Sequence, residues 1–287
     1  MKQPMNTENG AAFDIAGTDE SDTGFHKNHA RYFVPGLQRG LRVLEIVGAA
    51  GRPVSVAEVT AELGLTRSSV FRLIYTLRHM GFLQETENTR QISLGPRVLN
   101  LGFAYLASKD IIELALPELE ILRDLSGVSA HLAIRDERDV LYLCCVQTRS
   151  GFLSNMNVGA RVPAYASPMG WVLLGNLTLS ELNKLYSDAD YKVLTQHTPR
   201  NVSELAVKVS EAMSRGFVVS RGVMEPGGSS ISAPVFDKKN MIAAAINISG
   251  PDSAFDIDAL EDRYAGQVVA AAQRISAKLG HAQAFLR

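Results

Sequence analysis

The sequence predicts an α+β protein of two domains, and three observations support this prediction. The chain has 287 residues, of which 46% are apolar, so it can bury a sizeable core and is long enough for two domains. Residues 37–80 repeat apolar side chains at helical spacing, and a short hairpin pattern follows them. From residue 109 onward, strand-like runs and separate helices are typical of a mostly antiparallel sheet flanked by helices.

Charge is distributed unevenly along a chain whose formal net charge is −1. Residues 1–30 hold two Lys and five acidic residues with few aliphatic side chains, and we expect a disordered tail there. Residues 31–108 hold nine Arg against five Glu, whereas residues 109–287 hold 18 basic and 20 acidic residues. The basic block indicates a nucleic-acid partner for the N-terminal domain.

The N-terminal domain, residues 31–95, begins with an amphipathic helix over residues 37–50. Its side chains predicted to face inward are Leu41, Leu44, Ile46 and Val47. Next, Ser55 and Glu58 have the spacing of a capping box, which opens a short helix over residues 56–63. Gly64 then predicts a tight turn into a second helix, which completes a helix-turn-helix pattern.

The second helix, over residues 66–80, carries two contrasting faces. Its apolar stripe is Val70, Leu73, Ile74 and Leu77, extended by Met80. The opposite face holds Ser68, Arg72, Tyr75 and His79, and no carboxylate. A face with hydroxyls and a guanidinium but no acid suits a polyanion.

Two strand-like runs, residues 82–86 and 90–94, follow this helix and predict a hairpin wing with Arg90 near its tip. Three helices and a hairpin make a winged helix-turn-helix, which predicts binding to double-stranded operator DNA. The alternative is a winged helix used for protein contact. The residues predicted to bind DNA are Thr66, Arg67, Ser68, Ser69, Phe71, Arg72, Tyr75 and Arg90.

These residue types match the chemistry of a DNA surface. Arg67, Arg72 and Arg90 can meet phosphates or a guanine edge. The hydroxyls of Thr66, Ser68 and Ser69 stand at a helix N-terminus, where amides and hydroxyls suit phosphate oxygens. Phe71 and Tyr75 can pack on sugar or a thymine methyl, while Arg39 and Arg42 are either backbone contacts or solvated.

Residues 96–109 predict a linker helix with a broad apolar surface, which we expect to pack against a partner chain. A homodimer or tetramer is expected because one winged helix covers only a half-site. Residues 110–287 form the second domain. Its predicted helices cover residues 111–125 (interrupted by Pro117), 167–177, 180–186, 202–215 and 257–279, and its strands cover residues 130–135, 139–148, 152–157, 161–165, 217–221, 230–237 and 241–249.

Several classes of protein find little support in the sequence. No apolar run reaches the length of a membrane span, and no signal-peptide pattern opens the chain, so we expect a cytoplasmic protein. The adjacent Cys144 and Cys145 point to opposite faces of a strand and are either buried small hydrophobes or redox sensors. Nucleophile-elbow, P-loop and zinc-protease motifs are missing, so no enzyme activity and no cofactor are expected. A metal held by residues distant in sequence stays open.

Four stretches together resemble the IclR family of bacterial transcriptional regulators, and the resemblance covers essentially residue 37 to the C-terminus. They are residues 66–81 with the wing, VPAYASPMG at 162–170, RGFVV at 215–219, and APVFD at 233–237 with INISGP at 246–251. The resemblance implies a linker helix used in dimerisation and a GAF-like C-terminal domain. That domain would bind a small metabolite, often an organic or aromatic acid, and change promoter binding at catabolic genes.

Matching the family's pocket positions residue by residue implies an effector site on the sheet, under the helix that follows Ser167. Its residues are Pro168, Met169, Ser220, Ser230, Asn247 and Ser249. Asn247 and Ser249 alternate along one strand and share a face, where their partners are a ligand or, alternatively, backbone and water. Arg221, Arg149 and His131 are candidate carboxylate anchors, with surface or structural roles as the alternative.

Two segments depart from the family pattern. Residues 220–227, SRGVMEPG, stand where the family has several acids and a His, and Pro168 with Met169 stand where it has small residues. Both segments border the family's effector cavity, so the resemblance does not carry over a particular ligand. Whether the protein represses or activates also stays open. The alternative function is a small-molecule-binding or enzymatic domain whose winged helix serves assembly.

Overall fold

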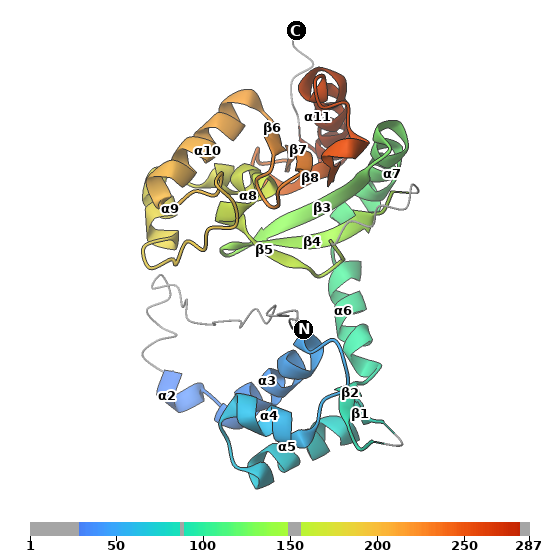
Figure 1. Ribbon diagram of the computed structural model, residues 1–287, viewed down its shortest axis with the longest axis vertical. Helices are drawn as coiled ribbons and strands as arrows, with labels where there is room; N and C mark the ends of the chain where they lie inside the picture. The colour runs from blue at the N-terminus through green and yellow to red at the C-terminus, as the bar shows by residue number, and fades with distance from the viewer. Residues whose placement is uncertain (1–28, 87–88, 149–155, 282–287) are drawn as a thin grey trace, which may run out of the picture. The chain divides into compact units, whose positions relative to one another are not determined.

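The computed structural model describes residues 29–86, 89–148 and 156–281, which divide into two compact units between Tyr105 and Leu106. The N-terminal unit is a set of short helices with a two-stranded hairpin, and the C-terminal unit is built on a six-stranded sheet (Figure 1). The predicted α+β fold class is therefore confirmed. The predicted tail lies outside the described residues except at positions 29 and 30, where helix α2 (His29–Tyr32) begins.

The N-terminal unit contains the predicted helix-turn-helix and wing. Its elements are α3 (Pro35–Ala49), α4 (Val56–Leu63), α5 (Arg67–His79), β1 (Leu83–Glu85) and β2 (Ile92–Leu94). The two strands pair antiparallel, with Gln84 opposite Ser93. The hairpin tip at residues 87 and 88 lies outside the described residues.

Local hydrogen bonds set the boundaries of the helix-turn-helix. The Ser55 hydroxyl accepts from the Glu58 amide at 3.2 Å, and the Glu58 carboxylate accepts from the Ser55 amide at 2.8 Å, which confirms the capping box. Hydrogen bonds from the Ser55 amide, which has the largest effect, and from the Arg52 side chain lower the pKa of Glu58 to about 2. Gly64 closes α4 at φ 61°, a left-handed conformation that glycine adopts without strain.

The core of the N-terminal unit contains some of the side chains that helical spacing predicts to face inward, namely Val47, Val70 and Ile74, and others of them, namely Leu44, Ile46, Leu73 and Leu77, are partly buried against it. Its buried side chains are Val43, Val47, Val54, Val59, Val70, Ile74, Leu83 and Ile92. Two expectations were wrong, because Leu41 and Met80 are exposed. Val43, which is buried instead, lies two residues or about 200° from Leu41 around α3, and Met80 is the C-cap residue of α5.

A third backbone segment braces the wing, which periodicity does not predict. The Val54 amide donates to the Ile92 carbonyl at 2.9 Å, and the Ile92 amide donates to the Val54 carbonyl at 2.7 Å. This bridge ties the connection between α3 and α4 to strand β2. The hairpin is thereby held at its base, next to α5.

The sheet of the C-terminal unit is antiparallel, with strand order β5-β4-β3-β8-β7-β6. Its strands are β3 (Ser129–Asp136), β4 (Asp139–Val146), β5 (Arg161–Pro163), β6 (Val218–Arg221), β7 (Gly228–Phe236) and β8 (Ile242–Pro251). The strand predicted over 152–157 falls outside the described residues up to 155, and residues 156 and 157 are not in a strand. The chain turns into a short 3-10 helix, η1 (Ala164–Ala166), directly after β5.

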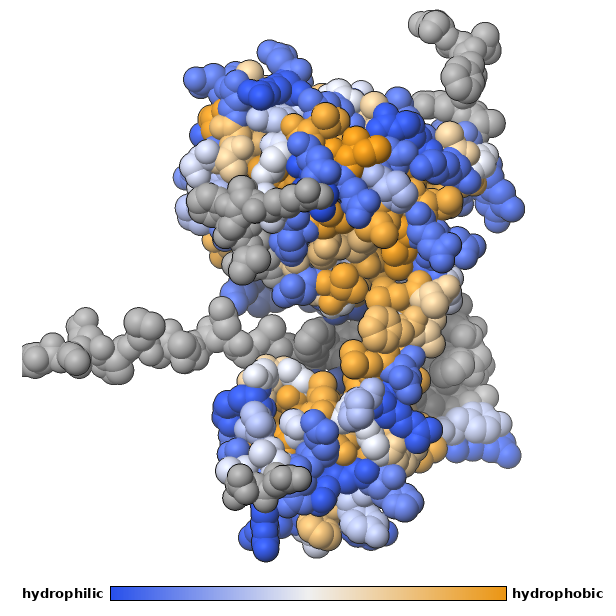
Figure 2. All heavy atoms as spheres, turned by 90° about the vertical axis from the view of Figure 1, so that its right-hand side faces the viewer, coloured by the Kyte–Doolittle hydropathy of each residue, from blue (hydrophilic) through white to orange (hydrophobic). Residues whose placement is uncertain are grey.

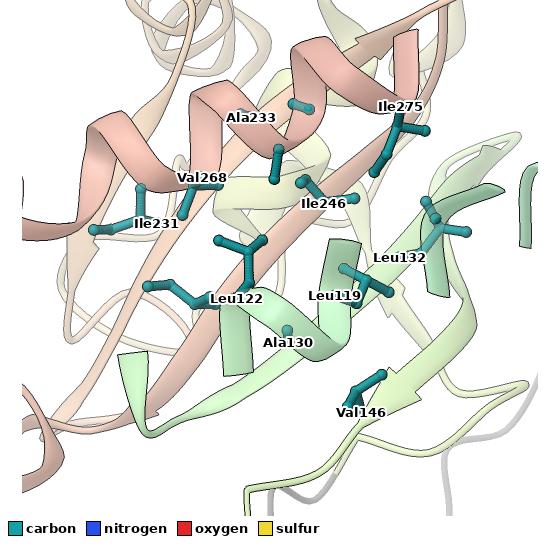
Figure 3. Close-up of a cluster of buried hydrophobic side chains, with 14 of the residues drawn as sticks. Leu119, Leu122, Ala130, Leu132, Val146, Ile231, Ala233, Ile246, Val268 and Ile275 are labelled. Carbon is teal, nitrogen blue, oxygen red and sulfur yellow. The ribbon is translucent and has the colours of Figure 1, made fainter. Parts of the chain in front are cut away.

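Two long helices cover one face of this sheet. They are α7 (Asp110–Ser126), which follows the linker helix α6 (Arg97–Ala107), and α11 (Leu260–Lys278). Figure 3 shows how their apolar side chains meet the strands; the labelled residues are Leu119, Leu122, Ala130, Leu132, Val146, Ile231, Ala233, Ile246, Val268 and Ile275. Each such Leu, Ile or Val stabilises the fold by about 1.5–3 kcal/mol relative to exposure.

Helix α7 runs through Pro117, so the predicted interruption was wrong. Proline lacks an amide proton and costs one helical hydrogen bond. On both sides of it, Ala115 and Leu119 are fully buried against the sheet. Their packing offsets the lost bond and keeps the helix continuous.

Shorter helices cover the opposite face. Helix α8 (Pro168–Leu173), extended by the 3-10 helix η2 (Leu174–Asn176), packs on β7 and β8, while α9 (Leu179–Leu185) and α10 (Val202–Arg215) lie outside it (Figure 1). A Cβ on Gly170 would come within 2.1 Å of the Ala164 carbonyl oxygen, so only glycine permits this approach of α8 to η1. Every described helix is too short or too polar to span a bilayer.

Candidate functional site

The outer face of α5 is exposed and carries unpaired cations. Phe71 and Tyr75 are 59% and 63% exposed, and Tyr75 stacks on His79. In the described part of the chain, the side chains of Arg67, Arg72 and Arg90 form no ion pair. Arg78 differs, because it pairs with Glu85 of the wing at 2.5 Å. The helix thus presents positive charge outward and uses one arginine to hold the wing.

The first turn of α5 gathers three hydroxyl groups. The Thr66 side chain accepts from the Ser69 amide at 3.4 Å and caps the helix. Its oxygen also lies 2.9 Å from the Ser69 hydroxyl and 3.2 Å from the Ser68 hydroxyl. Hydroxyls beside the free amides of a helix N-terminus are suited to phosphate oxygens. Arg90, at φ 53°, lies on the wing, beside the tip.

The linker helix α6 has an unusual surface for a solvated helix. None of its residues is buried, and Leu101 and Phe103 are each 62% exposed, with Leu99 and Tyr105 also exposed. Figure 2 shows the resulting apolar surface over this segment. Exposed apolar patches of this kind usually mark contact surfaces.

In the C-terminal unit, sheet register brings serines from four strands into one row. Ser220 pairs with Ser230, Ser230 with Ser249, and Ser249 with Ser129. Residues paired across antiparallel strands point to the same face. The Ser220 and Ser230 hydroxyls are 2.9 Å apart, and the Ser129 hydroxyl donates to Gln147 at 3.2 Å.

A second row lies next to the serines on the same face. His131 pairs with Asn247 and with Cys145, and Asn247 pairs with Ser232. His131 is fully buried, and its Nδ1 lies 2.9 Å from the Asn247 Oδ1. Burial lowers the pKa of His131 to about 4, against the opposing effect of the Asn247 hydrogen bond, so the ring is uncharged at neutral pH.

The serine row and Asn247 form the floor of a cavity of about 510 Å³. The start of α8 lies over it, and the turn between β6 and β7 borders it. Six predicted effector residues line it: Pro168, Met169, Ser220, Ser230, Asn247 and Ser249. The lining also includes Ser129, Tyr142 and Thr148, which sequence reasoning missed, together with Ser167, which precedes α8, and Glu225, which lies in the divergent segment 220–227. Alternation along the strands places Ser129 on this face, but only the register reveals its neighbours.

The candidate carboxylate anchors have different positions. Arg221 is exposed, lies 3.4 Å from Asp252, and lines a separate open groove of about 640 Å³ along the edge strand β6. His131 lies buried behind Asn247, and Arg149 lies outside the described residues. Among the described lining residues of the cavity, Glu225 is the charged one.

The Tyr142 phenol and the thiols of Cys144 and Cys145 are held in their neutral forms. Burial raises the pKa of the Tyr142 phenol, whose ring lies edge-on to His131 with centroids 5.7 Å apart. Burial also raises the pKa of the Cys145 thiol to about 12 and that of Cys144. The two thiols pack in different hydrophobic clusters, on opposite faces of the sheet. In residues 29–86, 89–148 and 156–281, no three His, Cys, Asp or Glu side chains lie together in a way that could hold a metal ion.

A winged helix with a basic outer face, joined in one chain to an α+β unit with a small-molecule cavity, defines the class of two-domain transcriptional regulators. The comparisons with known proteins agree. The protein-family model described as "Bacterial transcriptional regulator IclR C-terminal" matches residues 103–277, and the family model of the IclR helix-turn-helix domain matches residues 36–87. The chain belongs to the IclR family of bacterial transcriptional regulators.

Individual relatives cover most of the chain. The Pca regulon regulatory protein of Pseudomonas putida is 29% identical over 86% of this chain and 84% of its own length. The transcriptional repressor AllR of Escherichia coli K12 is 28% identical over 85% of this chain and 90% of its own. The fold matches an IclR homologue of Microbacterium hydrocarbonoxydans complexed with 4-hydroxybenzoate, with a TM-score of 0.73, 20% identity and coverage of 85% and 99%.

Proposed function

We propose that this regulator reads operator DNA with the outer face and first turn of α5 and with the wing. The residues assigned to DNA are Thr66, Arg67, Ser68, Ser69, Phe71, Arg72, Tyr75 and Arg90. The observation that carries the assignment is that this face has no carboxylate, while Arg67 and Arg72 have no ion pair within the described residues. Cations left unpaired at an exposed surface are available to phosphates.

The cavity of the C-terminal unit is proposed to bind a small organic or aromatic acid that modulates promoter binding at catabolic genes. Its volume of about 510 Å³ suits a small metabolite. Two relatives support the acid and the gene class by analogy: one is named for the Pca regulon, and a fold relative was crystallised with 4-hydroxybenzoate. In this role the lining residues supply hydrogen bonds and carry out no catalysis.

A homodimer, or a tetramer built from dimers, is proposed to form through α6. The exposed side chains of Leu99, Leu101, Phe103 and Tyr105 support this assignment. Two winged helices are needed to contact both halves of a two-fold symmetric operator. The effector then acts by favouring one dimer geometry over another, which changes the spacing of the two α5 helices.

One experiment tests both halves of the proposal. Fluorescence anisotropy with DNA from the protein's own promoter region is measured at rising salt, with and without members of a panel of organic and aromatic acids. We expect affinity to fall by about 100-fold or more between about 50 and 200 mM salt. We also expect at least one acid to shift the affinity and to raise the melting temperature by mass action.

The unfavourable outcomes separate the parts of the proposal. Affinity that is independent of salt would refute the DNA-reading face and would leave the winged helix a role in assembly. DNA binding that no acid alters would refute the effector class. Light scattering that finds a monomer would refute the role of α6.

A further inference from the structure

The amide of Asn247 has one end anchored in the protein and one end directed to the cavity. Asn247 is 5% exposed, and it lines the cavity. Its Oδ1 lies 2.9 Å from the Nδ1 of the fully buried His131. Within the described residues, the hydrogen bond of the Asn247 side chain is made by Oδ1, and Nδ2 takes no part in it. A donor at the wall of a cavity needs an acceptor from the contents of that cavity, and a ligand oxygen can take this place.

The protonation of His131 decides which end of the amide faces inward. A neutral imidazole carries one N–H, and a carboxamide oxygen can only accept. The 2.9 Å contact to Oδ1 therefore requires the proton on Nδ1. Ser249 Oγ lies 3.5 Å from the same nitrogen, on the cavity side of the pair. With Oδ1 occupied, the two protons of Nδ2 remain for the cavity.

We propose that His131 is a positioning residue that holds the Asn247 amide with its NH₂ group toward the cavity, so that the site selects ligands presenting an acceptor oxygen. A carboxylate or carbonyl oxygen at this point completes the hydrogen bonds, whereas an amine or ammonium there leaves donor facing donor. This inference rests on the proposed function and deepens it, because it names the atom of the acid that Asn247 recognises.

The charges of the other lining residues make the orientation of the Asn247 amide important for ligand selectivity. The described lining residues include no Lys or Arg, and their charged member is Glu225. Among the described residues, the groups that can hold a carboxylate here are therefore neutral donors, namely Asn247 and the hydroxyls of the serine row. Sites built from fixed hydrogen-bond donors discriminate strongly against ligands that cannot accept those bonds.

The first test needs no ligand. Long-range ¹H–¹⁵N spectra of the full-length protein labelled with ¹⁵N-histidine are recorded, and the His131 signals are assigned by their loss in His131→Gln. We expect a neutral ring protonated on Nδ1 at pH 7. A ring protonated on Nε2 would mean that the Asn247 amide is turned around, and this result would overturn the inference while leaving the proposed acid effector untouched.

The second test uses calorimetric titration of small carboxylates, 4-hydroxybenzoate among them, and of the amines with the same carbon skeletons. We expect wild type to prefer the carboxylate by about tenfold or more. Asn247→Ala and His131→Leu should each lower that preference, and His131→Gln, which keeps an N–H donor, should restore most of it. Asn183→Ala, on the exposed surface of α9, is the matched control.

Each outcome of the titrations has a meaning. Variants that melt like wild type but keep its full preference would overturn the role of His131. A wild type that prefers the amines would overturn the polarity of the site while preserving a small-molecule effector. A wild type that binds no carboxylate would refute the proposed effector class and, with it, the selectivity inferred here, whereas the histidine spectra would still decide the orientation of Asn247.

Discussion

The outer face of α5 and the cavity of the C-terminal unit are both polar, yet their polarity is built in opposite ways. On α5, charged and hydroxyl groups are neighbours within 13 residues of one helix, and they are exposed. In the cavity, neutral groups come from strands far apart in sequence; His131 and Asn247, which bond to each other, are separated by 116 positions. One surface is arranged for charge and the other for directed hydrogen bonds.

This difference has a physical reason. Exposed charges keep their hydration and act on a polyanion over a distance that salt screens. Buried charges without partners are costly, so a small cavity gains selectivity from neutral donors held in place. Salt should therefore weaken DNA binding strongly and effector binding little.

The largest effect is expected from the double variant Arg67→Ala with Arg72→Ala. Both side chains lack an ion pair in the described residues, so their loss should leave folding intact and remove two phosphate or base contacts. We expect operator affinity to fall by about 100-fold. The number of counterions released on binding, given by the slope of log affinity against log salt concentration, should fall by about two. Fluorescence anisotropy at several salt concentrations measures both quantities.

Lys239→Ala is the control for this variant, because it removes one positive charge from an exposed turn of the C-terminal unit. It should leave DNA affinity unchanged. If the double variant bound DNA as tightly as wild type, α5 would not be the DNA-reading element.

The next effect concerns pH and the buried His131. Its pKa is about 4 in the folded protein, below the ordinary value near 6.5, so the unfolded chain takes up the proton first as pH falls. The contribution of His131 to the free energy of unfolding is fully present above about pH 6.5. It is lost as pH falls toward 4, by up to about 3 kcal/mol. Denaturant unfolding of wild type and His131→Gln between pH 7 and pH 4 measures the difference.

The variant should lose less stability than wild type over that range, and hydrogen exchange should place the difference in the C-terminal unit. Equal losses in the two proteins would show that His131 is not buried in its neutral form. Asp, Glu and the other His residues contribute equally to both proteins, so the comparison isolates one side chain.

A smaller effect is expected from the ion pairs. Glu118 is buried and joins α7 to α11 through Arg274 at 2.8 Å and Lys278 at 2.9 Å. Burial raises the pKa of Glu118, but the hydrogen bonds from Lys278 and Arg274 outweigh it and hold the pKa below its ordinary value. Glu118→Ala should destabilise the C-terminal unit by about 2 kcal/mol, since both cations can return to water.

Arg52→Ala, which breaks the exposed pair with Glu58 at 2.6 Å, should leave the melting temperature nearly unchanged. Calorimetric melting of the two variants makes the comparison. Equal melting temperatures for both would contradict the importance assigned to burial.

Local sequence was enough to predict the N-terminal unit and the outer face of α5. A helix repeats every 3.6 residues, so Val70 and Ile74 must lie opposite Arg72 and Tyr75 wherever the helix packs. The capping box at Ser55 and the turn at Gly64 are also local, because their hydrogen bonds join residues three positions apart. Only packing could show that Leu41 lies outside the core.

The cavity depended on contacts between distant residues. Alternation along β8 placed Asn247 and Ser249 on one face, but it could not say which residues of β3 and β7 lie opposite them. A shift of one residue in register would turn His131 away from Asn247 and send Leu132 to the cavity side. The hydrogen bonds that set the register of β3 against β8 join residues more than 100 positions apart, and so His131 became known as the neighbour of Asn247 only with the folded sheet.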